Sequence, residues 1–335
     1  MSADATVIAQ EPATTKAADL EGALAALAQD YSVLSARMRE LQHSVTCECD
    51  GVTLRAHFPS ITQGKAAVHE LLDVMIHFLP WFALPRSEVA AAEAKLAKLD
   101  PKTAFVEISK IIQAARALFI KANKATNRSG EAGEFILSIL TEWILKAPQL
   151  IAKMSLKTNP EMPVHGADGI HGYYTTESKK LVLYWGESKV YTDVGQAMTE
   201  AVKSIVEANM PEKQKHELHL VSRYIDFAGL GHEAKTDLLR FLDPFDEAYN
   251  TKLHVTTCLI AFNCQHYSSI LSEGENAEAK FRALLEDQLA ALSKQFGDRL
   301  KKANLGHQLV ELFLFPVPSV DELRAAFHSK IGWGS

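Results

Sequence analysis

The chain has 335 residues, of which 47% are hydrophobic and 23% are charged, a composition typical of folded globular proteins rather than of disordered tails or fibres. This length allows one large domain or two of ordinary size, either of which can bury an adequate core without disulfides. The 35 Lys and Arg residues against 41 Asp and Glu residues give a formal net charge of −6. This balance excludes a protein that coats polyanions non-specifically, since such affinity comes from Lys and Arg on phosphates.

Cysteine usage and the lack of membrane-type segments predict a cytoplasmic protein. The longest apolar run, residues 74–85, is interrupted by His77 and two prolines and is too short to span a bilayer. Residues 1–16 lack the basic start and the apolar stretch of a signal peptide. Four cysteines are too few for a secreted disulfide framework and form no CxxC pair for zinc: Cys47, Cys49, Cys258 and Cys264.

The N-terminal part divides into a mobile leader, residues 1–18, and a mostly helical region, residues 19–128. Apolar side chains at three- and four-residue spacing predict an amphipathic helix that starts near Leu20 and ends near Leu41. Two short β-type runs joined by an Asp-Gly dipeptide predict a hairpin over residues 44–58. Three helical stretches follow before residue 124, with breaks at proline positions: Pro80, Pro85 and Pro101.

The C-terminal part, residues 129–335, has the pattern of an α/β domain with a mixed central sheet flanked by helices. A helix is predicted from Gly130 to Met154, with Ser129 as its N-cap and a division at Pro148. Tyr-, Val- and Leu-rich runs predict strands, the first two of them paired as an antiparallel hairpin. These strands are expected at residues 169–175, 180–191, 252–263 and 308–316, and further helices at 193–209, 211–224, 273–304 and 320–330.

Charged side chains gather around the predicted hairpin. Successive side chains on a strand alternate between faces, so Glu187 and Lys189 point the same way. Asp168 stands at the mouth of the preceding strand, where the hairpin would bring it beside Glu187. Glu134 lies in the first turns of the preceding helix, three residues after Glu131 and on nearly the same side. We therefore predict that three or four carboxylates converge with one lysine.

Carboxylates that converge with a lysine suit metal-assisted hydrolysis of a phosphodiester. Mg²⁺ prefers hard oxygen ligands, lowers the pKa of a bound water and neutralises phosphate charge, and Mn²⁺ is expected to substitute for it. Lys189 would orient or deprotonate the attacking water, or offset charge in the transition state. Gln196 would hold the lysine or a DNA phosphate. The expected metal ligands are Asp168, Glu187, Glu134 and the backbone carbonyl of Ser188.

Each of these residues also has a simpler explanation. A Glu-x-Lys pair on a strand is usually a solvated ion pair, but its order with Asp168 and the helix glutamates favours catalysis. Glu131 and Glu134 also suit the helix dipole, and only one of them need be a ligand; Glu134 is favoured. His165 and His171 flank the aspartate as surface histidines or as DNA contacts. The sequence has no GxxxxGK[ST] or GxGxxG motif, so no nucleotide site is expected in this chain.

The order of these motifs resembles the PD-(D/E)xK nuclease superfamily over about residues 130–196, with residues 252–263 as a later strand of its core. A narrower resemblance is to the HamA family of the Hachiman anti-phage defence system, and it extends more loosely over most of the chain. It is carried by GEAGE at residues 130–134, HGADGIHG at residues 165–172 and LYWGESKVY at residues 183–191. One departure from the superfamily pattern is Gly166-Ala167 in place of the nominal proline before Asp168.

The resemblance implies a Mg²⁺-dependent deoxyribonuclease of low sequence specificity that works in complex with a superfamily 2 helicase, HamB. It also implies a restriction-endonuclease-like core within residues 129–335. The helical region, residues 19–128, contains no recognised chemistry and is the candidate helicase-binding or regulatory surface. Two alternatives stay open: a catalytically inactive nuclease-fold adaptor that regulates the helicase, and an RNase, because a metal site that acts on phosphate does not itself distinguish the sugars.

Overall fold

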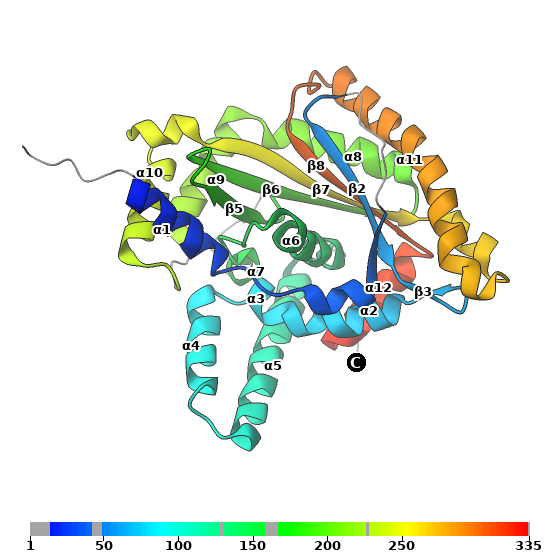
Figure 1. Ribbon diagram of the computed structural model, residues 1–335, viewed down its shortest axis with the longest axis horizontal. Coiled ribbons are helices and arrows are strands. Elements are labelled where there is room, and N and C mark those ends of the chain that lie inside the picture. Colours follow the sequence, from blue (N-terminus) through cyan, green and yellow to red (C-terminus); the bar gives the residue numbers. More distant parts are fainter. Residues whose placement is uncertain (1–13, 42–48, 127–129, 158–166, 226–227, 334–335) are drawn as a thin grey trace, which may run out of the picture.

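A curled, mixed sheet lies at the centre of the molecule, with helices on both of its faces (Figure 1). It is seen in a computed structural model that describes residues 14–41, 49–126, 130–157, 167–225 and 228–333. The predicted leader therefore lies outside the described residues up to residue 13, as does the predicted cap Ser129. Among the helices of the described part, none is long and apolar enough to cross a membrane.

The central sheet has six strands in the order β1-β2-β8-β7-β6-β5. The four inner strands β2, β8, β7 and β6 run parallel to one another, and the edge strands β1 and β5 are antiparallel to their neighbours. This arrangement confirms the predicted α/β class with a mixed sheet. The strands are β1 (Met38–Leu41), β2 (Val52–Pro59), β5 (Ile170–Thr175), β6 (Lys180–Tyr191), β7 (Leu253–Asn263) and β8 (Val310–Val317), with a small separate ribbon of β3 (Ile61–Thr62) and β4 (Lys65–Ala66).

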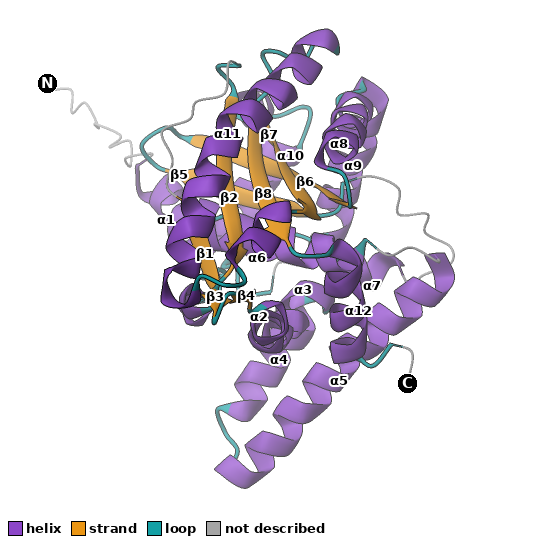
Figure 2. Cartoon of the chain, turned by 90° about the vertical axis from the view of Figure 1, so that its right-hand side faces the viewer, coloured by secondary structure: helices purple, strands orange, loops and turns teal. Residues whose placement is uncertain are grey.

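One face of the sheet is covered by a single apolar core. Phe135 of α6 and Phe327 of α12 pack there with Leu259 of β7 and Phe313 of β8. The helices on this face include α2 (Val68–Met75), α3 (Leu79–Ala83), α5 (Pro101–Thr126), α6 (Glu131–Leu145) and α12 (Val320–Ile331). The helix α4 (Arg86–Leu96) packs beside α5, and this helical hairpin extends away from the sheet (Figures 1 and 2).

The other face carries two separate apolar cores. The first lies over β7 and β8 beneath α8 (Val194–Ala208) and α11 (Ala277–Lys302). The second lies over β5 and the first half of β6, beneath α1 (Thr14–Ala25), α9 (Pro211–Tyr224) and α10 (His232–Leu242). Short elements complete the chain: α7 (Lys153–Lys157) and the 3₁₀ turns η1 (Ser32–Ala36), η2 (Ile76–Phe78), η3 (Glu247–Thr251), η4 (Gln265–Ile270) and η5 (Gly274–Asn276).

The predicted helix from Leu20 to Leu41 is wrong beyond its first part. The helix α1 ends at Ala25, and the residues before Leu41 form the edge strand β1. The misleading signal came from Tyr31 and Leu34, which are 4% and 0% exposed although they lie in or beside a 3₁₀ turn. Apolar spacing records burial, and a buried turn can continue the spacing of a helix.

The predicted hairpin over residues 44–58 is correct only in its second strand, β2. Its partner is β1, with Met38 opposite Pro59, whereas residues 44–48 lie outside the described residues. The Asp-Gly dipeptide serves a close approach to the strand β8: a Cβ added at Gly51 would lie 2.4 Å from the carbonyl oxygen of Gln308. The glycine is therefore required by packing against a distant segment.

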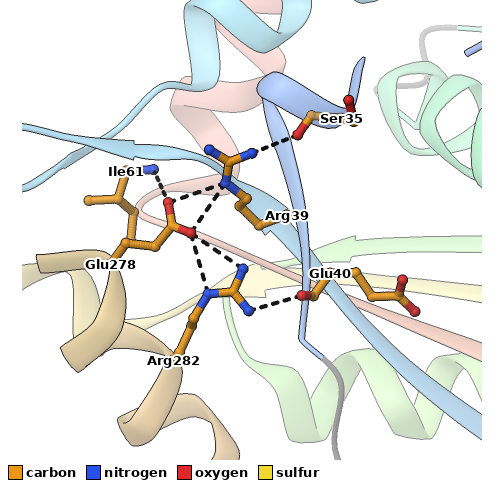
Figure 3. Close-up of polar contacts among 6 residues, drawn as sticks. All are labelled: Ser35, Arg39, Glu40, Ile61, Glu278 and Arg282. Atoms are coloured by element: carbon orange, nitrogen blue, oxygen red, sulfur yellow. Dashed lines mark hydrogen bonds and ion pairs between the residues drawn. The ribbon is translucent and has the colours of Figure 1, made fainter. Parts of the chain in front are cut away.

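A polar cluster fixes the edge strand β1 to the helix α11 (Figure 3). Arg39 of β1 donates to the Ser35 carbonyl at 2.6 Å and lies 3.2 Å from the carboxylate of Glu278. Arg282, one turn further along α11, pairs with the same carboxylate at 3.3 Å and donates to the Glu40 carbonyl at 3.0 Å. One glutamate thus pairs with two arginines and ties the sheet edge to α11.

The later elements follow the sequence prediction closely. The strand β6 and the helix α9 have the predicted bounds, β5 and β6 form the predicted antiparallel hairpin, and α6 ends at Leu145, before Pro148. The N-terminal region contributes β1 and β2 to the same sheet as the C-terminal strands. The boundary placed at residues 128–129 therefore divides the sequence but not the sheet.

Candidate active site

The candidate site lies just before the first residue of β5, where Asp168 and Gly169 continue the pairing with β6. Gly186 donates its N–H to the Gly169 carbonyl at 2.8 Å, and Asp168 donates its N–H to the Gly186 carbonyl at 2.7 Å. The Asp168 carboxylate then accepts hydrogen bonds from the backbone N–H of Ser188 at 2.7 Å and from its hydroxyl at 2.8 Å. The sheet itself brings Asp168 beside the Glu-x-Lys segment.

Glu187 and Lys189 point to the same face of β6, as their spacing predicts. The Lys189 Nζ lies 2.5 Å from the Glu187 Oε1, and each side chain is 18% exposed. Burial and the nearby charge of Asp168 raise the pKa of Glu187, against the effect of Lys189. Burial lowers the pKa of Lys189, but the charges of Glu187 and Asp168 outweigh it, so this pKa is raised overall. The Lys189 ammonium is thus paired with Glu187 and further stabilised by the nearby charge of Asp168.

These residues line a cavity of about 1150 Å³ on the face of the sheet that carries two apolar cores. Trp185 belongs to one core and Tyr191 packs against the other, so Glu187 and Lys189 occupy the gap between them on β6. The walls come from the end of α8 and the first turns of α9. The cavity is therefore polar at the strand and bounded by packed apolar side chains on either side.

Glu134 reaches the same cavity from the opposite face of the sheet. A Cβ added at Gly133 would lie 2.6 Å from Val190 and 3.3 Å from Ser188, so α6 packs on the face away from Glu187. Glu134 lines the cavity, whereas Glu131 is 4% exposed and lies in the interior.

The predicted convergence of three or four carboxylates is not seen as one ligand group. In the part of the chain that the structure describes, no three His, Cys, Asp or Glu side chains are grouped so as to hold a metal. The reason is the strand between them: Asp168 lies at its edge, Glu187 on one face, and Glu134 arrives from the other.

Two further predicted residues, Gln196 and His171, lie outside this cavity. Gln196 is exposed at the start of α8, where its N–H donates to the Asp193 carboxylate at 2.7 Å, and it does not line the cavity. The expected surface position of His171 is wrong: its side chain is 1% exposed and lies 3.1 Å from the Ser138 hydroxyl. Burial lowers the pKa of His171 to about 3, so the ring is neutral. His165 lies outside the described residues.

Several cavity residues were not found from the sequence. Ser204 of α8 hydrogen-bonds to Glu187, and Arg324 of α12 donates to the Val190 carbonyl. Neither belongs to a motif: Ser204 lies in the helix that follows β6, and Arg324 lies far away in the sequence. Only the helical periodicity of α8 gave a weak signal for Ser204. It lies three residues after the buried Ala201 and next to the buried Ile205, and therefore near the buried side of the helix.

The donor set of Asp168 and Glu187 fits a divalent cation. Two carboxylates and one ammonium carry one net negative charge in a partly buried place, where burial and the charge of Asp168 raise the pKa of Glu187. A bound cation would favour the ionised form of both carboxylates. The Ser188 N–H points to Asp168, and since the N–H and C=O of one strand residue face the same edge, so does its carbonyl. Hard oxygen donors of this kind suit Mg²⁺, which keeps several of its own waters.

A comparison with known protein families identifies the family of this chain. The HamA family model matches residues 39–331, from the edge strand β1 to the last residue of α12. The chain belongs to the HamA family. Membership suggests a protein associated with Hachiman defence, and HamA is associated with a nuclease-like role. A search among curated proteins gave no match. The HamA match covers the N-terminal strands together with the candidate site, in agreement with their shared sheet.

Proposed function

We propose that this HamA-family chain is a Mg²⁺-dependent deoxyribonuclease of the PD-(D/E)xK type with little sequence specificity, and that it acts with the superfamily 2 helicase HamB in a Hachiman defence complex. The observation that carries the proposal is that Asp168, bound to Ser188 at the edge of β6, and the Glu187–Lys189 pair on the face of β6 line the same large cavity. The helicase partnership rests on family membership.

Asp168, Glu187 and the Ser188 carbonyl would hold the metal, with Glu134 at the cavity wall. Bound Mg²⁺ supplies a more acidic water and neutralises charge on the scissile phosphate. The raised pKa of Lys189 keeps its side chain an ammonium at neutral pH. In the metal-free site this ammonium suits two of the three expected roles, orienting the attacking water or offsetting negative charge on the phosphate, better than removal of a proton from water.

The charge of the cavity supports delivery of DNA by a partner. Among the described residues that line it, five are acidic, against three basic ones. Without a metal this surface repels phosphate, and the chain as a whole carries a net charge of −6. Isolated protein is therefore expected to bind duplex DNA weakly at physiological salt. The acidic residues are Glu134, Asp168, Glu187, Glu207 and Glu217, and the basic ones are Lys189, Lys213 and Arg324.

The test is digestion of linear and circular DNA with Mg²⁺ or Mn²⁺, by the chain alone and with the helicase and ATP. Asp168→Asn and Glu187→Gln should each reduce cleavage by about 100-fold or more, because a carboxylate that neutralises metal charge is lost. Asp287→Asn, the same substitution at an exposed position of α11 outside the cavity, serves as the matched control and should cleave as wild type does.

The same experiment separates the alternatives. Equal behaviour of wild type and both carboxylate variants on DNA, with the helicase present, would contradict the proposal and favour the inactive adaptor. Cleavage of RNA but not DNA under the same conditions, lost in Glu187→Gln, would place the chemistry at this site but assign it to an RNase.

A further inference from the structure

A buried ion pair lies at the wall of the cavity that contains the candidate site. Lys153, the first residue of α7, and Glu217 of α9 are 3% and 6% exposed, and the Lys153 Nζ lies 2.9 Å from the Glu217 Oε2. Buried ion pairs are weak contributors to stability, since desolvation offsets much of their attraction and apolar replacements are often neutral. Its presence beside the cavity therefore needs another explanation.

The same ammonium holds the residue that precedes the candidate metal ligand. Lys153 Nζ also donates to the backbone carbonyl of Ala167. On the other side, the Asp168 N–H donates to the Gly186 carbonyl at 2.7 Å. The peptide unit between Ala167 and Asp168 is thus held from α7 at its carbonyl and from β6 at its N–H. Without Lys153, only the β6 bond would fix its orientation.

Glu217 links this support to the cavity. It lines the cavity, and its second carboxylate oxygen, Oε1, is buried without a hydrogen-bond partner within the described part of the chain. One oxygen of Glu217 therefore orients Lys153, which in turn holds the Ala167 carbonyl. Its negative charge balances the lysine, so the support adds no net charge next to the metal ligands.

We propose that Lys153 and Glu217 are positioning residues, which hold the Ala167–Asp168 peptide so that the Asp168 carboxylate is oriented for a divalent cation. The inference rests on the proposed metal-dependent function of the site. It assigns to a pair outside any sequence motif a role in metal affinity that is separate from the stability of the fold.

The experiment compares metal affinity with stability in the full chain. Mn²⁺ binding is measured by calorimetry and unfolding by heat, without nucleic acid, for wild type and the double variant Lys153→Met/Glu217→Leu. The apolar pair removes both buried charges and fills similar space, so the thermal midpoint should stay close to that of wild type. Mn²⁺ affinity should fall at least tenfold, because the bond to the Ala167 carbonyl is lost.

Two single variants complete the design. Lys153→Arg retains the charge and the donors and should bind Mn²⁺ within about threefold of wild type. Lys280→Met, which removes an exposed pair with Glu273 on α11, is the control and should leave Mn²⁺ affinity unchanged. If the double variant does not fold, Lys153→Met replaces it; this change also removes the bond to the Ala167 carbonyl, so the same loss of affinity is expected.

The outcomes separate this inference from the proposed function. Wild-type Mn²⁺ affinity in a folded double variant would overturn the positioning role and leave the proposed nuclease intact. Loss of affinity that matches the loss of thermal stability, with no rescue by Lys153→Arg, would also overturn it. If wild type itself neither binds Mn²⁺ nor cleaves nucleic acid, the proposed function fails and the inference falls with it.

Discussion

At the scale of single residues, the candidate site is arranged against the stability of the metal-free protein. Glu187 is largely buried beside another carboxylate, and Lys189 compensates only in part, so its pKa is raised. A buried carboxylate with a raised pKa opposes folding once it is ionised. Such local conflict is expected where a group is selected for binding a ligand.

The raised pKa of Glu187 predicts that Glu187→Gln stabilises the metal-free protein at neutral pH. Between the unfolded and the folded pKa of this group, the native state binds more protons than the unfolded state, so the free energy of unfolding falls as pH rises through that window. The glutamine variant does not lose stability in this way, because its side chain does not ionise. Denaturant unfolding between pH 4.5 and 7.5 in a chelator measures the difference.

Addition of Mn²⁺ supplies the control for this prediction. The cation should stabilise wild type by mass action and the glutamine variant much less. The difference in the free energy of unfolding between the two proteins should therefore shrink or change sign. A Gln variant that is less stable than wild type in the chelator at every pH would contradict the prediction. It would show that the ion pair with Lys189 stabilises the protein by more than the ionisation of buried Glu187 costs.

At the scale of elements, the close packing of α6 on β6 determines where Glu134 lies. Gly133 occurs where the helix meets the strand, and a Cβ there would lie 2.6 Å from the Cγ2 of Val190. The neighbouring residues Glu131, Ala132 and Phe135 are all buried. A larger residue at position 133 would therefore force the first turn of α6, which includes Glu134, to move away from β6.

Gly133→Ala is expected to destabilise the protein by about 1–3 kcal/mol, because β-branched Val190 cannot move far within a packed core. It should also reduce cleavage by displacing Glu134. The matched control is Gly22→Ala in α1, where an added Cβ meets nothing within 4 Å and alanine should stabilise by about 0.5–1 kcal/mol. Denaturant unfolding checks both; equal effects of the two substitutions would contradict the close-packing argument.

The strand β6 and its pairing with β5 could be predicted from the sequence because both depend on residues that are close together in the chain. Period-two alternation fixed Glu187 and Lys189 on one face of β6, and the strand pairing followed from the short turn. The positions of Arg324 and Glu217 could not be predicted, since each depends on how a distant helix packs. The position of Gln196 outside the cavity could not be predicted for a related reason: its distance in sequence from Lys189 does not reveal the direction in which α8 leaves the strand.

At the scale of the whole molecule, the N-terminal region and the candidate nuclease core form one sheet. Strand β2 lies between β1 and β8, and its Leu54, Ala56 and Phe58 are buried. Removal of β2 would expose the edge of β8 and one of the apolar cores. The sequence alone suggested a boundary because the N-terminal region is rich in helix, and helical content does not reveal strands that pair over long distances.

A fragment of residues 129–335 is therefore expected to aggregate or remain unfolded, since the open edge of β8 is apolar. Coexpression with a fragment of residues 1–128 should restore solubility by supplying β1 and β2. Solubility and far-ultraviolet circular dichroism of the two preparations measure this. A fragment of residues 129–335 that is soluble and cooperatively folded on its own would contradict it.

The pairing of β2 with β8 also sets the time at which the sheet can be completed during protein synthesis. Val52 lies opposite Val310, so β2 must wait for about 250 further residues, or about 13–50 s at translation rates of roughly 5–20 residues per second. Strand β8 separates β2 from β7. A nascent chain on the ribosome therefore carries both halves of the sheet unjoined, and the cavity with its carboxylates gains its full support only near the end of translation.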